Sequence, residues 1–180
     1  MPKTTLAGHP LHPQLVEFPL GLLPFSCLMD VMHYVTGNES YAKTAYHTMM
    51  GGVVGGLAAG TAGAADYLTI PSDSESKKVA NLHGLINLGV MGLYGLNVFL
   101  RRGRRPPTGP VPLLLSLLGT AGLIASAWYG GELVYKLGMR VEPLMEGDQS
   151  AEWKLPNDRK LADAFRSAEE RLAPVGGPQE

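Results

Sequence analysis

Four long apolar segments, separated by short polar stretches, dominate the first three quarters of the chain. Each approaches or exceeds the roughly 20 residues that cross a hydrocarbon core about 30 Å thick. Three of the four are apolar on all faces, whereas a helix of a soluble bundle keeps a polar stripe. The pattern therefore predicts an all-α fold, a four-helix transmembrane bundle within residues 1–141, and argues against a soluble bundle. The predicted helices cover about residues 15–35, 44–70, 79–100 and 111–135.

The second segment is unusual because it is apolar yet rich in glycine between Met49 and Leu68. Glycine disfavours a helix in water by about 1 kcal/mol relative to alanine, but in lipid the helix is what satisfies the backbone. Small residues at a spacing of four let neighbouring helices approach closely. We therefore predict a central transmembrane helix, in which leucine at Gly56 or Gly60 would push a neighbour away. Its small residues form two stripes, Gly52, Gly56 and Gly60, and beside them Gly51, Gly55, Ala59 and Gly63.

The polar ends of these segments predict the orientation in the membrane. Four arginines lie within residues 101–105, and short loops rich in basic residues stay in the cytoplasm. With four spans, the N-terminus, the loop at 71–78 and the C-terminal tail then lie outside, although Lys77 and Lys78 argue weakly against this. The prediction is a multi-pass protein of the cell inner membrane with both termini external.

The remainder of the chain, residues 142–180, is predicted to be a polar extramembrane tail. Residues 158–172 place apolar side chains on one face of a helix and charged side chains elsewhere, which is typical of a short amphipathic helix. The apolar face consists of Leu161, Phe165, Ala168 and Leu172.

Composition narrows the function classes. A net charge of −1 argues against nucleic acid as a partner. The single cysteine, Cys27, excludes an internal disulfide and a cysteine-based metal cage within one chain. No Cys-x-x-Cys, c-type haem attachment or phosphate-binding glycine loop occurs. We expect no enzyme activity.

Polar residues near the helix ends are predicted to meet at the outer face, because antiparallel spans bring alternate ends to one height. Ionisable groups within membrane segments are costly and indicate function. His12, Asp66 and His83 form the candidate metal site, with His9 and Glu132 as further candidates, because imidazoles with a carboxylate suit a divalent metal. The alternatives are a b-type haem and a hydrogen-bond network without any cofactor. The outer set also includes Glu17, Tyr67, Asn81, Asn87 and Tyr135.

A second polar group is predicted at the inner face, where Asp30, His33 and His47 approach Arg101. Two histidines on adjacent helices can hold a haem iron from both sides. However, His33 and His47 flank a loop near the water boundary. An Asp30–Arg101 ion pair with solvated histidines is therefore the favoured interpretation.

Several motifs resemble one known family. The opening Gly8-His9-Pro10-Leu11-His12-Pro13 is similar to the start of a family of bacterial four-helix membrane proteins, catalogued as domain of unknown function twenty-two thirty-one. Further similar stretches are 59–68, 83–87 and 130–141, so the resemblance covers residues 8–141. The chain departs at Glu17, where members often carry histidine, and this weakens an all-histidine site. The resemblance implies an integral membrane protein in a redox setting, because members often accompany iron–sulfur and cytochrome proteins, and it implies no reaction.

Together these features predict an accessory subunit of a redox or energy-converting membrane complex. It would contact lipid and other membrane subunits through its helices and dock through its tail. The alternative is a metal- or haem-binding membrane protein with its ligands at the outer face. A small transporter is disfavoured, because the segments contain no chain of ionisable residues at mid-membrane.

Overall fold

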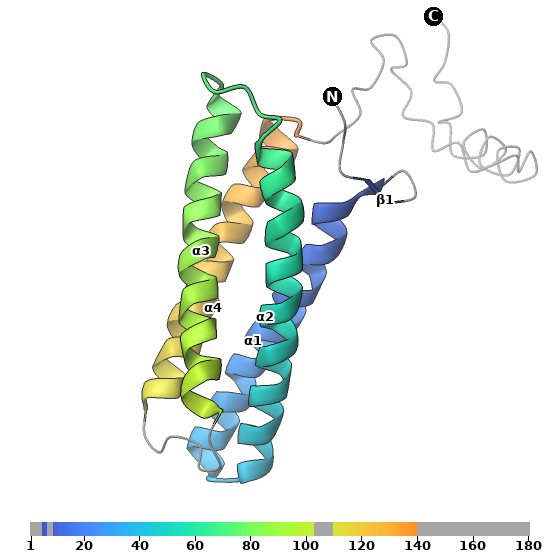
Figure 1. Ribbon diagram of the computed structural model, residues 1–180. Helices are drawn as coiled ribbons and strands as arrows, with labels where there is room; N and C mark the ends of the chain where they lie inside the picture. Colours follow the sequence, from blue (N-terminus) through green and yellow to red (C-terminus); the bar gives the residue numbers. More distant parts are fainter. Residues whose placement is uncertain (1–4, 7–8, 103–109, 140–180) are drawn as a thin grey trace, which may run out of the picture. The chain divides into compact units, whose positions relative to one another are not determined.

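The computed structural model is a bundle of four long helices, each antiparallel to its neighbour in sequence (Figure 1). The structure describes residues 5–6, 9–102 and 110–139. The all-α, four-helix prediction is confirmed, while the predicted tail helix at 158–172 lies outside the described residues. The elements are β1 (Thr5–Leu6), β2 (His9–Pro10), α1 (Leu11–Thr36), α2 (Glu39–Tyr67), α3 (Glu75–Arg101), α4 (Val111–Gly131) and a π-helical turn, η1 (Glu132–Lys136).

Two helices begin earlier than predicted because polar residues cap them. The Asn38 side chain accepts a hydrogen bond from the Ser40 amide at 2.9 Å, so α2 begins at Glu39 instead of near residue 44. The Ser74 hydroxyl accepts from the Lys77 amide at 3.1 Å, so α3 begins at Glu75 instead of near residue 79. Such caps satisfy backbone donors that the first helical turn leaves without partners.

Helix α1 also begins earlier than predicted, at Leu11 instead of near residue 15. A residue before proline is expected in extended backbone, and both His9 and His12 precede a proline. His9 meets this expectation in β2, which pairs with β1. His12 does not, because α1 already begins at Leu11. Pro13 follows it inside the first turn, where backbone N–H groups have no helical acceptor and a proline loses no hydrogen bond.

Three of the helices are long and apolar enough to cross a membrane. They are Leu11–Thr36, Glu75–Arg101 and Val111–Lys136. Their outer surfaces are apolar, with Leu85, Leu88 and Ile124 at least 67% exposed, as expected for side chains that face lipid. Helix α2 is not among the three, since its many glycines lower its mean hydropathy. Its crossing of the membrane stays a prediction.

Glycine sets the close approach of α2 to α1. A Cβ atom at Gly51 would lie 3.2 Å from the Leu22 side chain, one at Gly55 would lie 2.6 Å from Phe18 Cβ and one at Gly63 would lie 3.0 Å from the His12 ring. The second predicted stripe therefore faces α1, and the predicted close approach of a neighbouring helix is confirmed. Gly52 of the first stripe also faces α1, where a Cβ atom would lie 2.4 Å from the Leu23 side chain.

The first predicted stripe is only partly an interface. A Cβ atom at Gly56 would lie 2.6 Å from Met91 Sδ of α3, whereas one at Gly60 would meet nothing within 4 Å. The prediction that Gly60 spaces a neighbouring helix is therefore wrong. Residues four apart drift by about 40° around a helix of 3.6 residues per turn, so a long stripe leaves its interface.

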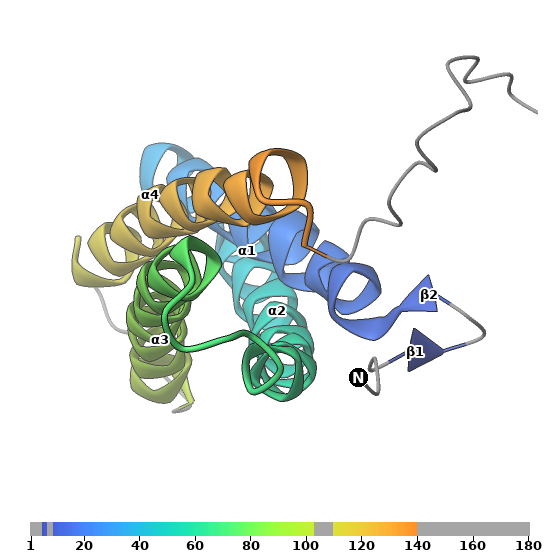
Figure 2. The ribbon, with the colours of Figure 1, turned by 90° about the horizontal axis from the view of Figure 1, so that it is seen from above.

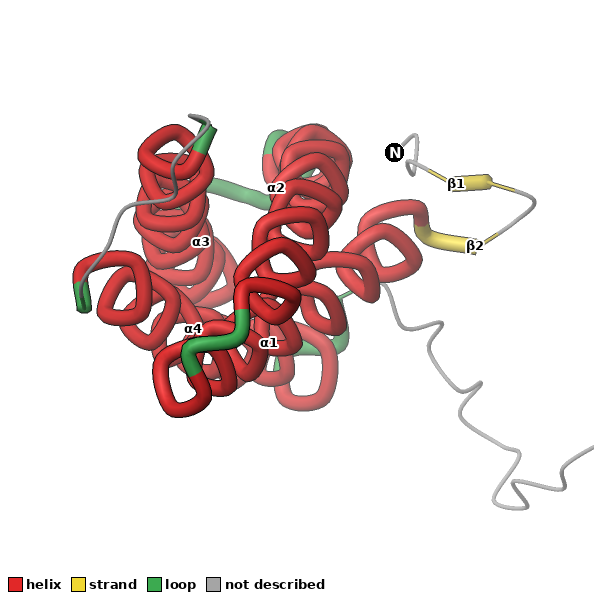
Figure 3. The backbone as a smooth tube through the Cα atoms, turned by 90° about the horizontal axis from the view of Figure 1, so that it is seen from below, coloured by secondary structure: helices red, strands yellow, loops and turns green. Residues whose placement is uncertain are grey.

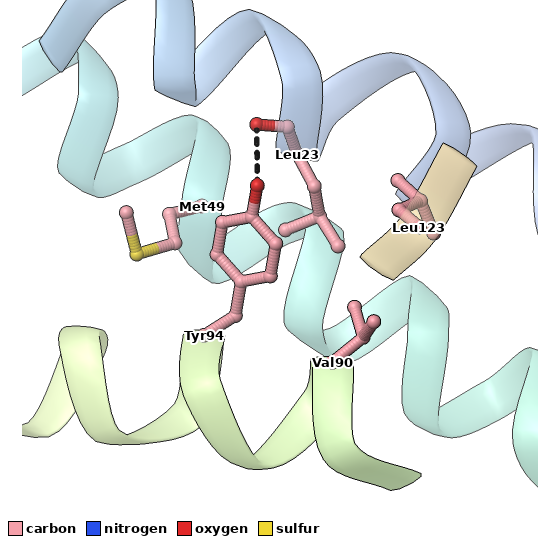
Figure 4. Close-up of a cluster of buried hydrophobic side chains, with 5 residues drawn as sticks. All are labelled: Leu23, Met49, Val90, Tyr94 and Leu123. Atoms are coloured by element: carbon pink, nitrogen blue, oxygen red, sulfur yellow. Dashed lines mark hydrogen bonds between the residues drawn. The ribbon is translucent and has the colours of Figure 1, made fainter. Parts of the chain in front are cut away.

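End-on views place α1 beside α2 and α4, and α3 beside α4 and α2 (Figures 2 and 3). The apolar core lies where these helices face one another. Tyr94 of α3 points into it toward Leu23 of α1 (Figure 4). The core cluster consists of Leu23, Met49, Val90, Tyr94 and Leu123.

Candidate functional site

A buried ion pair lies at the end of the bundle that contains the α1–α2 loop. Arg101 donates from Nη1 to Asp30 Oδ1 at 2.6 Å and from Nη2 to Asp30 Oδ2 at 2.8 Å. Both side chains are buried, with 5% and 4% of their surface exposed. The favoured sequence interpretation, an Asp30–Arg101 pair, is confirmed. A bidentate pair is the geometry that best offsets the cost of burying two charges.

Neutral polar side chains complete this pair into a network. Ser116 Oγ donates to Asp30 Oδ2 at 2.6 Å, and Arg101 Nε donates to Asn97 Oδ1 at 2.8 Å. Asn97 Nδ2 in turn lies 2.9 Å from both Pro112 O and Ser116 Oγ. The network joins α1, α3 and α4. Sequence reasoning missed Asn97 and Ser116, because a single polar residue in an apolar segment does not reveal which neighbour it faces.

Tyr94 extends the polar contacts into the core. Its hydroxyl lies 3.3 Å from Leu23 O, 3.2 Å from Ser116 O and 2.7 Å from Thr120 Oγ1. A phenol has one proton, so Thr120 can donate to Tyr94 while Tyr94 donates to a carbonyl. The hydroxyl thus holds the centres of α1, α3 and α4 together.

The two inner-face histidines take no part in this network. His33 Nδ1 donates to Asn38 O at 3.1 Å, and His47 Nδ1 donates to Lys43 O at 2.7 Å. Both bonds are exposed and local, at the end of α1 and between the second and third turns of α2. This agrees with the interpretation of solvated histidines.

At the opposite end of the bundle, His12 and His83 each bind the neighbouring helix of their own hairpin. His12 Nδ1 lies 2.8 Å from Ala59 O of α2. His83 Nδ1 lies 2.9 Å from Ser126 O of α4 and 3.1 Å from the Ser126 hydroxyl. A carbonyl oxygen only accepts, so each Nδ1 carries the proton and each Nε2 carries a lone pair. Asn87 Nδ2 donates to the lone pair of His83 at 3.0 Å.

Glycines make room for both imidazole rings. A Cβ atom at Gly63 would lie 3.0 Å from His12 Cε1, and one at Gly130 would lie 3.2 Å from His83 Cε1. Each ring therefore rests directly on a helix backbone. This contact fixes the ring plane as well as the position of Nδ1.

The remaining candidate residues are exposed or have partners of their own. Asp66 is 8% exposed near the end of α2 and engages other groups of the protein. His9 is exposed in β2, and Glu132 pairs with Lys136 in η1. Within 5–6, 9–102 and 110–139, no three His, Cys, Asp or Glu side chains lie close enough to hold a metal ion. The structure thus does not bring His12, Asp66 and His83 together into one donor set.

Comparison with known proteins gives one match. A family model described as "Predicted membrane protein (DUF2231)" matches residues 8–143. No curated protein and no solved structure matches the chain.

Proposed function

Because the chain belongs to the DUF2231 family of predicted membrane proteins, we propose that it is an integral membrane accessory subunit of a redox or energy-converting complex. In this role it packs laterally against other subunits in the inner membrane and stabilises them without catalysing a reaction. The redox part of the proposal depends on the fact that similar bacterial proteins often accompany iron–sulfur and cytochrome proteins. The packing role depends on the surface of the bundle.

The observation that carries the proposal is a set of glycines that face outward. Gly60 of α2 and Gly89 and Gly92 of α3 are exposed, and a Cβ atom at any of them would meet nothing within 4 Å. They lie among exposed apolar residues such as Leu85 and Leu88. Outward-facing glycines weaken a helix by about 1 kcal/mol each relative to alanine. On a lipid-facing surface they allow the backbone of another helix to approach closely.

The interior of the bundle supports a structural role. Its buried polar side chains bind one another or nearby carbonyl groups, as the network around Asp30 and Arg101 illustrates. Ser26 donates to Leu23 O at 2.7 Å, and Ser126 contacts His83 at 3.1 Å. Polar groups that are already satisfied in this way stabilise one arrangement of helices and are poorly available to a substrate.

In this proposal all four helices cross the membrane. Helix α2 contacts α1 through glycines from Gly51 to Gly63, so the two share one depth in the bilayer. Its 29 residues extend about 43 Å, more than the hydrocarbon core requires. The loop between α1 and α2 then lies in the cytoplasm, and both termini lie outside.

Native complexes provide the test. Membranes containing the tagged protein are solubilised in mild detergent. Mass spectrometry identifies the subunits that co-purify, and visible absorption detects redox cofactors bound to them. We propose that the partner contacts the surface around the exposed glycines Gly60, Gly89 and Gly92, the proposed contact face. Gly60→Leu and Gly92→Leu should release the partner, because each places a bulky side chain on this face.

Gly21→Leu is the matched control. Gly21 of α1 is also exposed with nothing within 4 Å of a Cβ atom, but it lies on a different helix. It should leave the complex intact. A monomeric wild-type protein in gentle detergents, or equal release by all three variants, would contradict the proposed contact face. A partner complex without redox cofactors would contradict the redox assignment alone.

A further inference from the structure

The two helical hairpins, α1–α2 and α3–α4, repeat the same internal contacts. Each contact places a side chain of the first helix on a glycine of the second. Leu23 packs on Gly52 as Tyr94 packs on Gly119, and Pro19 packs near Gly55 as Val90 packs on Gly122. His12 rests on Gly63 as His83 rests on Gly130. The hydrogen bonds repeat as well, since Ala59 O accepts from His12 where Ser126 O accepts from His83.

Equivalent positions of α1 and α3 are 71 residues apart, and they meet across the bundle. Tyr94 contacts Leu23 O, and Arg101 pairs with Asp30, both at this separation. The two helices run in the same direction, because each is antiparallel to α2 (Figure 1). The hairpins are therefore related by an approximate two-fold axis along the bundle.

His12 and His83 are equivalent in the same sense. Each lies about three helical turns, or roughly 16 Å, before the Leu23–Tyr94 contact, so both lie at one height. They also lie within range of mutual electrostatic interaction. At the Asp30 end, the equivalent residues have opposite charges and bind each other. At this end, the equivalent residues are identical.

These two imidazoles cannot hydrogen-bond to each other through their Nε2 atoms. Both Nδ1–H groups already donate to carbonyls, so both Nε2 atoms are acceptors. A histidine whose Nδ1–H is held by a carbonyl while Nε2 carries the lone pair is in the state that binds metals. Asn87 occupies the lone pair of His83 with a single hydrogen bond, which a ligand can replace.

The number of nitrogen atoms that can coordinate a metal indicates which kind of ligand this site can bind. A bare divalent metal needs more protein ligands than two, and the described residues offer no group of three. A haem iron brings four nitrogens of its own and needs only two axial ligands. The buried residues near this end are the small Ala59, Ala62 and Ala80 together with Asp66 and Ile70.

We infer that His12 and His83 are the axial ligands of one b-type haem held between α1 and α3, each binding iron through Nε2. Asn87 then releases His83 and lies beside the ring. This inference does not depend on the proposed subunit role, because it concerns the isolated chain.

The test uses the full-length protein, purified in detergent and titrated with ferric protoporphyrin IX. The expected result is saturable binding of one haem per chain, with the low-spin absorption spectrum of bis-imidazole iron. His12→Gln and His83→Gln should each weaken binding at least tenfold and convert the spectrum to high spin. Glutamine removes the imidazole while keeping a side-chain N–H donor, and thermal unfolding of each haem-free variant checks that the fold is preserved.

His33→Gln and His47→Gln are matched controls, because these histidines lie at the other end of the bundle with local hydrogen bonds. They should bind haem as the wild type does. Non-saturable binding or a high-spin spectrum of the wild-type protein would overturn the inference without any variant. Retention of the low-spin spectrum in the His12→Gln and His83→Gln double variant would overturn it equally.

Discussion

The two ends of the bundle differ in the residues that occupy equivalent positions of α1 and α3. Around Asp30 and Arg101 the two positions carry opposite charges, and neutral side chains complete a closed network. Around His12 and His83 they carry the same residue, and each ring hydrogen-bonds within its own hairpin, His12 to Ala59 and His83 to Ser126 and Asn87. One end therefore locks the two hairpins together. At the other end these residues do not tie the hairpins together, and the Nε2 lone pair of His83 accepts one hydrogen bond from Asn87 that a ligand can replace.

The largest expected effect comes from breaking the locked end. Asp30→Ala leaves the Arg101 guanidinium buried without its partner, and removing one member of a buried pair costs about 3–5 kcal/mol. The free energy of unfolding in detergent, measured by denaturant titration, should fall by this amount.

The Asp30→Leu and Arg101→Met double variant is the control for that experiment. It removes both charges and restores apolar volume, so it should recover most of the lost stability. A loss below about 1 kcal/mol for Asp30→Ala would mean that Arg101 reaches water and that this end is not a lock.

Alanine substitutions at equivalent glycines compare how much stability each hairpin loses when its helix contact is disturbed. Gly119→Ala brings a Cβ atom within 2.6 Å of the Tyr94 ring, which hydrogen bonds hold in place. Gly52→Ala brings a Cβ atom within 2.4 Å of Leu23 Cδ2 and 2.7 Å of Leu23 Cγ. We expect Gly119→Ala to cost about 1–3 kcal/mol and Gly52→Ala less, because no side-chain hydrogen bond holds Leu23 in place. Thermal unfolding in one detergent measures both.

Gly60→Ala is the reference, because a Cβ atom there meets nothing within 4 Å. It should not destabilise the protein and should gain up to about 1 kcal/mol from helix propensity. If Gly52→Ala were the more harmful of the two interface variants, the α1–α2 contact would be the more rigid one.

A smaller difference is expected between the two histidines. His83→Ala removes hydrogen bonds to Ser126 and Asn87, whereas His12→Ala removes one to Ala59. In haem-free protein, His83→Ala should cost about 1–3 kcal/mol and His12→Ala about 0.5–1.5 kcal/mol. Equal losses in chemical denaturation would mean that Asn87 finds another partner.

The last prediction concerns the orientation of the bundle in the membrane, and its variants should change stability least. Glu39→Cys and Ser72→Cys place thiols at exposed positions near opposite ends of the bundle, while the native Cys27 is buried. A membrane-impermeant maleimide applied to intact cells should label Ser72→Cys and leave Glu39→Cys unlabelled until the cells are opened. The reverse pattern would put the arginine-rich loop outside.

Much of the architecture was predictable from the sequence, because the length of each apolar segment and the polar breaks between them leave few alternatives. The glycine stripe that faces α1 was also predictable, since residues such as Gly55 and Ala59 have no other evident use in a helix. The starts of α2 and α3 were placed too late, because the caps Asn38 and Ser74 lie in polar stretches that resemble loops.

The polar contacts were harder to predict. Asp30 and Arg101 are charged residues at the ends of apolar segments, so their pairing was the least costly arrangement. Tyr94, Asn97 and Ser116 carry no comparable signal. A helix that is apolar on all faces has no pattern that sets its rotation about its own axis.

The sequence by itself determined that this chain is a helical membrane protein with four long segments and histidines near the ends of two of them. Only the tertiary structure decided which faces meet, because helix rotation is set by packing against the neighbours and not by a polar stripe. It turned Gly60 outward and Gly56 inward, and it placed Asn97 and Ser116 around the ion pair. It also made His12 and His83 equivalent members of a repeated hairpin, since each imidazole binds a carbonyl that lies 47 or 43 residues away in the chain.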